Sequence, residues 1–426
     1  MIKIFKDGVS SREEIFSVVE PKMDVSSIVS DIIEDVKLNG DKALYKYAEK
    51  FDKVTLSSLA VKKEEIENAA KSVDKEFLRI LNDAAKNIRE FHSKQKRDGF
   101  EIKRENGVIL GQKIIPVDAA GLYVPGGTAA YPSTVLMDAI PAKIAGVKKV
   151  VMVTPPDKDG NVNPVILAAA YVAGVDEIYK VGGAGAIAAL AFGTESIPKV
   201  DKIVGPGNAF VAEAKKQVFG KVSIDMIAGP SEILVIADKN SNPKVVAADM
   251  LSQAEHDKLA SAVLITESES LANAVKEQLE EQIPKLPRAE IARASIDDNG
   301  KIIVVKDIER AIEIANDIAP EHLELCIDNA INYLDKIKHA GSVFVGRNCP
   351  EALGDYMIGM NHTLPTSGTA KFSSPLSVDD FIKKTQYAYY SEQALESIAK
   401  DVEYFAKKEG LTAHAKSAVV RLKDYE

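Results

Sequence analysis

The stretch of sequence that decides the fold runs from residue 147 to residue 208 and reads VKKVVMVTPPDKDGNVNPVILAAAYVAGVDEIYKVGGAGAIAALAFGTESIPKVDKIVGPGN. Strand-like apolar runs alternate here with Ala-rich segments of helical length. The runs are residues 147–156, 176–183 and 202–207, and the helical segments are 163–174, 186–193 and 208–218. Such alternation predicts a parallel sheet with helices on its two faces.

A second alternation of the same kind occupies residues 232–346. Its strand-like runs are EILVIAD (232–238), SAVLIT (261–266), KIIVV (301–305), HLELCI (322–327) and GSVFVG (341–346), with helical segments between them at 244–257, 270–283 and 308–319. The chain therefore predicts an α/β protein with two Rossmann-like parallel-sheet units. A site is then expected in a cleft between the two units.

Helical patterns flank these two units. Residues 11 to about 98 carry apolar positions at helical spacing, and the polar tail from about residue 376 also reads as helical. We predict an N-terminal helical arm (1–25), a discontinuous first α/β domain (26–122 with 232–375), a second α/β domain that binds the cofactor (123–231) and a helical C-terminal tail (376–426).

The composition excludes several classes of protein. The 426 residues carry 54 Lys and Arg against 63 Asp and Glu, a formal net charge of −9, which disfavours nucleic-acid binding. No run approaches the ~18 consecutive apolar residues of a membrane helix, and the first residues are too polar for a secretory signal. Cys326 and Cys349 cannot form a disulfide framework, so we expect a reducing, cytoplasmic location without membrane contact.

Polar clusters interrupt the α/β pattern at a few points. Gln253 and His256 are three residues apart and share one helix face, where they could supply two ligands to a zinc-type metal. Glu321 and His322 are adjacent between a helix and a strand, where they could act as an acid/base pair. Asp355 and His362 lie in a Gly-bounded loop, and His414 adds one imidazole near the end.

Each cluster by itself also admits a simpler interpretation. Glutamine is an unusual zinc ligand, so Gln253 and His256 could be no more than a polar helix end. A Glu-His dipeptide is common, and the zinc-protease motif H-E-x-x-H is absent. The nucleotide signals are equally open. Residues 183–188 fit G-x-G-x-x-A and Asp201 follows at the expected distance, but an Ala/Gly helix start also satisfies this pattern.

Two further turns could contact a nucleotide. Val204-Gly-Pro-Gly207-Asn208 is a Gly-rich turn between a strand and a helix, and such a turn can bind phosphate at the helix N-terminus. Tyr123-Val-Pro-Gly126 places an aromatic side chain next to a tight turn.

A longer set of motifs resembles one family. The run IDMIAGPSEILVIAD (224–238), followed by SQAEH (252–256), resembles the signature of histidinol dehydrogenases. In the family's order there also appear GLYVPGG (121–127), VGPGNAFV (204–211), APEHLEL (319–325), GDYMIGMNHTLPT (354–366) and TAH (412–414). The resemblance covers essentially the whole chain.

The resemblance implies a reaction, two cofactors and a set of site residues. Members oxidise L-histidinol to L-histidine through histidinal, the last step of histidine biosynthesis, with reduction of two NAD⁺. They carry one Zn²⁺ per subunit and form an intertwined homodimer. The implied zinc ligands are Gln253, His256, Asp355 and His414, and the implied acid/base pair is Glu321 and His322. Substrate contacts would come from Ser231, His322, His362, Glu409 and the four metal ligands, and NAD contacts from Tyr123, Gly185 and Asn208.

In an intertwined dimer, Glu409 and His414 would reach the partner's site. The chain also departs from the family's pattern at a few positions. Gly185 stands where the family usually has a glutamine that contacts NAD, so we expect Gly185→Gln to tighten NAD⁺ binding. Lys371 and Pro375 replace the usual Arg and Gly.

Three other classes of protein remain as alternatives. A zinc hydrolase could use the same metal ligands with Glu321 as base, but it would not need two nucleotide-like turns. A solute-binding protein could have two α/β lobes, but it would not need Glu321 and His322. A Cys-ligated zinc alcohol dehydrogenase is disfavoured because two cysteines cannot supply its metal sites.

Overall fold

The computed structural model describes residues 1–17, 24–126 and 130–422. The chain divides into two compact units, the first comprising Met1–Gln95 with Val117–Phe381 and the second Lys96–Pro116 with Ile382–Glu426. No helix in the described ranges has the length and apolar character that a membrane span requires.

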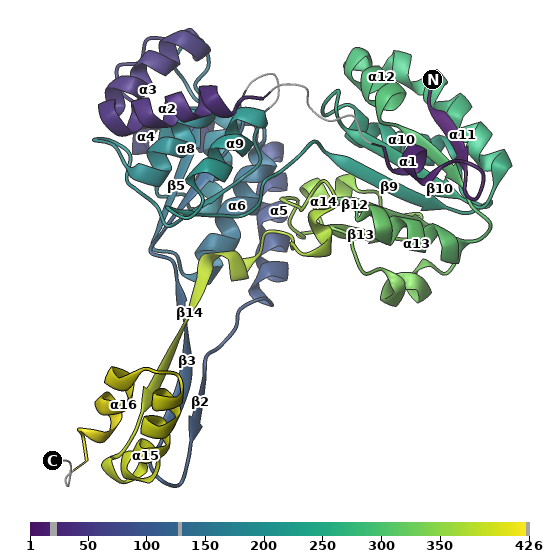
Figure 1. The fold of residues 1–426 in the computed structure, drawn as a ribbon. Helices are drawn as coiled ribbons and strands as arrows, with labels where there is room; N and C mark the ends of the chain where they lie inside the picture. Colours follow the sequence, from purple (N-terminus) through teal and green to yellow (C-terminus); the bar gives the residue numbers. More distant parts are fainter. Residues whose placement is uncertain (18–23, 127–129, 423–426) are drawn as a thin grey trace. The chain divides into compact units, whose positions relative to one another are not determined.

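Six parallel strands form the larger sheet of the first unit (Figure 1). Their order is β1 (Lys3–Lys6), β11 (Lys301–Val304), β10 (Ser261–Thr266), β9 (Glu232–Ala237), β12 (His322–Cys326) and β13 (Ser342–Val345). Helices α10 (Pro243–Ala254), α11 (Glu269–Gln282), α12 (Ala289–Asp298) and α13 (Ile308–Ile318) connect them. Ile233 and Val235 lie in one core while Leu234 and Ile236 lie in the other, because successive side chains of a strand point to opposite faces. The second predicted alternation is therefore confirmed.

Five parallel strands form the other sheet of this unit, as the opening stretch predicted. Their order is β6 (Glu177–Lys180), β5 (Lys149–Thr154), β4 (Ala119–Tyr123), β7 (Lys202–Val204) and β8 (Ser223–Ile224). The helices between them are α6 (Pro132–Ala145), α7 (Pro164–Ala173), α8 (Gly183–Phe192) and α9 (Ala209–Val218). Helices α6, α7 and α8 are apolar almost all round, which fits segments buried between a sheet and further helices, whereas α9 buries one side only.

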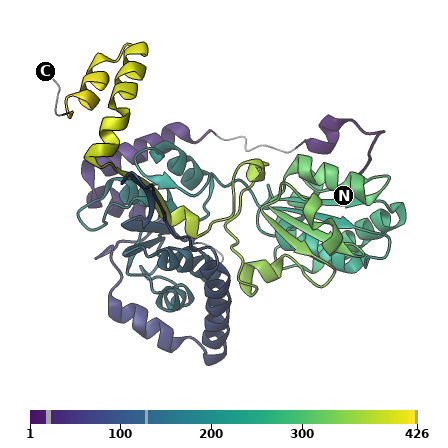
Figure 2. The same ribbon diagram turned by 90° about the horizontal axis from the view of Figure 1, so that it is seen from below.

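The helices of residues 26–93 pack on the helices that cover this five-stranded sheet, as both ribbon views show (Figures 1 and 2). They are α2 (Ser26–Asn39), α3 (Asp41–Tyr47), α4 (Lys63–Ser72) and α5 (Lys75–Ser93). Val29 and Leu44 share a core with Val151, and Ile88 shares a core with Leu136. The predicted domain division instead placed residues 26–122 in one domain with residues 232–375, which contain most strands of the six-stranded sheet. Apolar periodicity shows which face of a helix is buried, but it does not show which sheet covers that face.

The N-terminal arm also differs from a purely helical segment. Its described part contains the strand β1, which extends the six-stranded sheet beside β11, and the short helix α1 (Arg12–Phe16). Ser11 caps α1 through a reciprocal pair of hydrogen bonds with Glu14. Residues 18–23 of the predicted arm lie outside the described residues.

The second unit is an antiparallel sheet with two helices. Its strands are ordered β14 (Ile382–Tyr389), β3 (Ile109–Pro116) and β2 (Phe100–Lys103), and its helices are α15 (Glu392–Lys408) and α16 (Thr412–Val419). The tail predicted as helical from residue 376 therefore begins with a strand. The remaining short elements are the π-helix η1 (Ala48–Asp52), the helix α14 (Ala352–Tyr356) and the 3₁₀ segments η2 (Ile283–Lys285), η3 (Ala330–Lys336), η4 (Thr369–Lys371) and η5 (Val378–Phe381).

Candidate active site

The predicted acid/base pair lies at the amino end of β12, which is between β9 and the edge strand β13 of the six-stranded sheet. His322 is the first residue of β12 and is in register with Ile233 on β9 and Ser342 on β13. Glu321 immediately precedes the strand, and both side chains are buried. The pairing of β12 with β9 and β13 therefore fixes the backbone positions of Glu321 and His322.

Burial determines the protonation of Glu321. Its carboxylate oxygen Oε2 accepts a hydrogen bond of 2.8 Å from the backbone N–H of Glu232. Burial raises the pKa of Glu321 to about 7, although the charge of His322 and the hydrogen bond from Glu232 oppose that rise. A carboxyl group with a pKa near neutrality can both accept and return a proton under ordinary conditions.

His322 is surrounded by acceptors. Its Nδ1 lies 2.9 Å from the carbonyl oxygen of Glu232 and 3.6 Å from Oε2 of Glu321, and its Nε2 lies 3.8 Å from Oε1 of Glu351. Burial by itself would lower the pKa of His322, but the neighbouring carboxylates of Glu321, Glu351 and Asp355 outweigh burial and raise that pKa. The ring is therefore placed to take a proton.

Asp355 and His362 form a second pair beside this one. Asp355 lies on the short helix α14, and its Oδ1 is 3.3 Å from Nδ1 of His362. Burial alone would raise the pKa of Asp355, but the hydrogen bond from His362 and the charges of His322 and His256 lower it to about 2. Asp355 is therefore an anionic group at neutral pH, as a metal ligand would need to be.

The other two metal ligands expected from this part of the chain lie nearby. Gln253 is buried at the end of α10, and its side chain acts on the carboxylate of Glu351, whose pKa burial raises and Gln253 lowers. His256 follows one turn later, with its backbone N–H donating to the carbonyl of Gln253 over 3.0 Å. The charge of His256 acts on Asp355. The first unit thus brings Gln253, His256 and Asp355 to one site.

Glu351 is a functional candidate that the sequence analysis missed. Among the described residues, His322, Glu351 and Asp355 each offer one ligand atom, and these atoms lie within 4.8 Å of one another. Glu351 is 1% exposed, and its Oε1 finds no hydrogen-bond partner in the described parts of the chain. A buried orphan oxygen of this kind calls for a cation or a ligand atom. The sequence did contain a signal for Glu351: it precedes Asp355 by four residues, and residues at this spacing face the same side of a helix.

The expected cofactor residues lie on the five-stranded sheet. Tyr123 ends β4, is buried, and accepts a hydrogen bond of 3.1 Å from the backbone N–H of Gly183 at the start of α8. Asn208 is the N-cap of α9, and its Oδ1 accepts from the N–H groups of Phe210 and Val211. Tyr123 therefore lies at the carboxyl end of one parallel strand and Asn208 beyond that of another, which is the edge where nucleotides bind in such sheets.

Gly185 faces protein rather than open space. It lies inside α8, and a Cβ placed there would be 3.5 Å from Cδ2 of Leu44 and 3.6 Å from Cδ2 of Tyr47. A longer polar side chain would therefore enter the apolar packing of α3. This geometry disagrees with the expectation that Gly185→Gln tightens NAD⁺ binding.

Asp201 does not fit the nucleotide role that its spacing suggested. Its Oδ2 accepts hydrogen bonds from the backbone N–H groups of Asp118 and Ala119, at 3.1 and 3.0 Å. Asp201 therefore caps the amino end of β4, whereas a ribose-binding carboxylate would lie near the carboxyl ends of the strands.

Three further predicted residues have more limited descriptions. Ser231 precedes β9 and is half-buried, and its carbonyl accepts from the N–H of Ser261. Glu409 ends α15 and His414 lies on α16, both exposed on the second unit. Their expected role in a partner's site stays a prediction.

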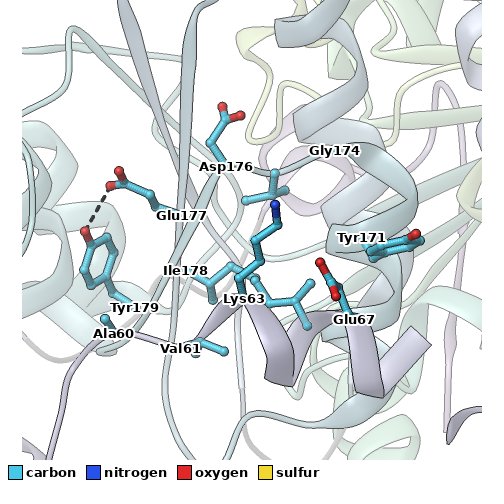
Figure 3. A pocket seen from close by; sticks show the side chains of 12 residues that line it. Ala60, Val61, Lys63, Glu67, Tyr171, Gly174, Asp176, Glu177, Ile178 and Tyr179 are labelled. Atoms are coloured by element: carbon cyan, nitrogen blue, oxygen red, sulfur yellow. Dashed lines mark hydrogen bonds between the residues drawn. The ribbon is translucent and has the colours of Figure 1, made fainter. Parts of the chain in front are cut away.

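A surface pocket of about 490 Å³ is lined by none of the predicted site residues. Figure 3 shows Lys63 and Glu67 of α4 among the lining side chains, with Glu67 on the side of Tyr171, and Glu177 accepting a hydrogen bond of 3.0 Å from the hydroxyl of Tyr179. Its polar groups do not converge on one point, so it supports no functional assignment.

Comparison with known proteins identifies the family. The sequence profile of histidinol dehydrogenases matches residues 18–422. A histidinol dehydrogenase from Clostridium acetobutylicum is 56% identical over 428 residues, which cover 99% of both chains. One from Listeria monocytogenes is 55% identical, with 94% of each chain covered. The chain belongs to the histidinol dehydrogenase family.

A solved histidinol dehydrogenase has the same fold. The crystal structure of the histidinol dehydrogenase from Elizabethkingia anophelis matches with a TM-score of 0.93 at 43% sequence identity and covers 99% of this chain and 98% of that one. The family resemblance and the α/β class expected from the sequence are therefore confirmed, and the chain is an oxidoreductase of this family.

Proposed function

We propose that this chain oxidises L-histidinol to L-histidine through histidinal, with reduction of two NAD⁺, at a zinc site completed by a second subunit. The observation that carries the proposal is the buried pair Glu321 and His322 beside Asp355, in a chain of the histidinol dehydrogenase family. The reaction would supply the last step of histidine biosynthesis, and we propose a cytoplasmic location for it.

The donor atoms fit a zinc ion. Gln253, His256 and Asp355 would hold it from this chain, with His414 from the partner. Such a nitrogen and oxygen set leaves room for the imidazole and amine of histidinol. Glu321, Glu351 and Asp355 also gather three buried or half-buried carboxyl groups, and the unpartnered oxygen of Glu351 is consistent with a nearby cation. Bound zinc would act as a template and Lewis acid for the substrate.

His322 would act in the first oxidation. The carbinol hydroxyl must lose a proton as its carbon loses hydride, and a buried imidazole with a free nitrogen is suited to accept that proton. Packing of the ring against Phe344, with centroids 6.1 Å apart, restricts its orientation. The product of this step is the aldehyde.

Glu321 would act in the second oxidation. Histidinal must add water before a second hydride can leave, and a carboxylate near the aldehyde can take a proton from that water. The pKa of Glu321, raised to about 7 by burial, lies close to the range in which a general base works best. The two steps thus use different members of one adjacent pair.

The five-stranded sheet would bind NAD⁺, which accepts the hydride in each step. Tyr123 and Asn208 would contact the dinucleotide from the ends of β4 and β7. Gly205 between them has φ +114°, and a Cβ there would lie 2.2 Å from the carbonyl oxygen of Tyr123. Only glycine therefore permits this close turn. Gly185 would contribute through its backbone.

A coupled assay tests the function. Purified protein with L-histidinol and NAD⁺ should produce NADH in a ratio of two per histidinol consumed. Removal of zinc by a strong chelator should abolish turnover while the circular dichroism of the backbone persists, because the two sheets bury their own apolar cores. Zinc added back should restore the rate. Turnover that survives a metal-free state verified by elemental analysis would contradict the assignment of the ligands.

A further inference from the structure

We propose that one face of helix α6, together with Asn361, positions His362 for its contact with the substrate. Thr134, Met137 and Asp138 form this face. The proposal rests on the function proposed above, which places His362 against histidinol. It makes Thr134, Asp138 and Asn361 positioning residues, since they act through His362.

The first contact uses a carbonyl that a proline leaves free. Pro141 lies inside α6 and has no N–H, so it cannot donate to the carbonyl of Met137 four residues earlier. The side-chain Nδ2 of Asn361 donates to that carbonyl over 2.7 Å. Asn361 is 4% exposed. A buried carbonyl needs a partner, so the proline creates an acceptor at one fixed point of the helix and Asn361 satisfies it.

The second contact holds the other side of His362. The Oδ1 of Asn361 accepts from the backbone N–H of Thr363 over 2.8 Å, and the hydroxyl of Thr363 donates to Oδ1 of Asp138 over 3.0 Å. The residues before and after His362 are therefore anchored to Met137 and Asp138, which are consecutive in α6. An anchored residue on each side leaves the backbone of His362 little freedom.

The third contact concerns the imidazole itself. The Nε2 of His362 lies 3.2 Å from the hydroxyl oxygen of Thr134, and its Nδ1 lies 3.3 Å from Oδ1 of Asp355. Thr134 and Asp138 are four residues apart and lie on the same face of α6. The ring is thus held by α6 on one side and by Asp355 on the other, which fixes the direction in which it meets a ligand.

The polar character of this face points to positioning rather than to stability alone. Val135, Leu136 and Ala139 around it are fully buried apolar residues. Asp138 is itself fully buried, and its Oδ2 finds no hydrogen-bond partner among the described residues. Burying a carboxyl group in this way is costly, and an apolar side chain would pack at less expense. Polar contacts, in contrast, specify distance and direction.

A pair of substitutions separates the two roles. Asn361→Ala should lower the melting temperature, because the carbonyl of Met137 loses its donor and the N–H of Thr363 loses its acceptor. It should also lower kcat/KM for histidinol by about tenfold or more. Pro141→Ala in the same chain supplies the missing N–H within the helix. The double variant should regain only the part of the melting temperature that the carbonyl of Met137 accounts for, because the N–H of Thr363 still lacks its acceptor. It should not regain the histidinol kinetics, since His362 remains unanchored. Recovery of both properties would overturn the proposal, because Asn361 would then serve stability only.

A matched control and a second measurement complete the test. Val275→Ala lies in the core of the six-stranded sheet and should lower the melting temperature without changing KM for histidinol. The imidazole NMR signals of His362, assigned by their loss in His362→Asn, should shift in the double variant and stay unchanged in Val275→Ala. This measurement needs no turnover. If the natural chain fails to oxidise histidinol, the proposed function fails, while unchanged His362 signals in the double variant refute the positioning role independently.

Discussion

The Nδ1 atom of His322 lies 2.9 Å from the backbone carbonyl oxygen of Glu232. A carbonyl oxygen only accepts, so this contact requires the hydrogen of the neutral ring to be on Nδ1. The lone pair is then on Nε2, which is the atom that can accept a proton. Oε1 of Glu351 lies 3.8 Å from Nε2, so a carboxylate faces the positive charge that protonation creates. The backbone carbonyl of Glu232 on β9 thus determines that Nε2 is the basic nitrogen of His322 on the neighbouring strand β12.

The division of labour between His322 and Glu321 predicts a selective defect. Glu321→Gln should slow the oxidation of histidinal by ~10²–10⁴-fold, because an amide cannot take a proton from water. The oxidation of histidinol to histidinal should be affected much less. Single-turnover measurements that start from each compound give the two rates separately, and equal losses in both would contradict the assignment.

Glu324 on the same strand offers the control. It is fully buried, and burial together with the charge of Asp249 raises the pKa of Glu324 to about 9. The carboxyl group of Glu324 is therefore neutral at pH 7, and the amide in Glu324→Gln has the same shape and the same zero charge. This variant should leave both steps close to those of the natural chain.

Asp138 predicts a pH dependence of stability. Burial and the charge of Asp225 raise the pKa of Asp138 to about 7, from an ordinary 3.8. Between these values the unfolded chain has released the proton and the folded chain retains it, so stability falls as pH rises from about 4 to about 7. Asp138→Asn removes this loss. It should be more stable than the natural chain at pH 8 by up to roughly 4 kcal/mol, at about 1.4 kcal/mol per pKa unit, and equal to it below pH 4.

Chemical denaturation at pH 5 and pH 8 measures this difference. Asparagine can still accept the hydrogen bond from Thr363, so the comparison isolates the charge. Asp159→Asn, in an exposed turn, should follow the natural chain at both pH values. A difference between Asp138→Asn and the natural chain that does not grow with pH would mean that Asp138 is ionised in the folded protein.

A shared active site predicts recovery of activity on mixing two inactive variants. His414→Ala lacks a ligand that would come from one subunit, and Glu321→Gln lacks the base of the other. If each tail completes the partner's site, the mixed dimer has one site with both defects and one with neither. Denaturation and refolding of the two variants together should restore activity to a fraction of the natural dimer. No recovery in a mixed dimer verified by mass spectrometry would show that each site is built from one chain.

The fold was largely readable from the sequence because buried parallel strands are continuous apolar runs. Residues 232–237 and 322–326 are examples, and both form strands. The strand β14 was missed because its residues Ile382–Tyr389 are mostly exposed and lack the alternation of a half-buried strand. The packing partners of residues 26–93 were also missed, since a helical pattern carries no information on which sheet it covers.

The site was predicted only as far as motifs reach. Glu321 and His322 are adjacent, so the sequence placed them together. Glu232 contacts both of them although it is about 90 residues away along the chain. Asp138 and Thr363 are in contact although they are 225 residues apart in the sequence. Only the fold brings such residues together. The one local signal for Asp138 was a single acid in a run of apolar helical residues.

Gly185 gives the last prediction. A Cβ atom at this position would lie at ordinary van der Waals distance from Leu44 and Tyr47, so the side chain of alanine should fit in Gly185→Ala. Alanine is favoured over glycine inside a helix by roughly 0.5–1 kcal/mol, and the variant should melt slightly higher with unchanged NAD⁺ affinity. Gly185→Gln should melt lower, because an amide buried among apolar side chains without partners costs about 1–3 kcal/mol. Differential scanning calorimetry gives the two melting temperatures, and titration calorimetry gives the affinity for NAD⁺. Tighter NAD⁺ binding by Gly185→Gln would show instead that the glutamine side chain turns away from α3 and reaches the cofactor.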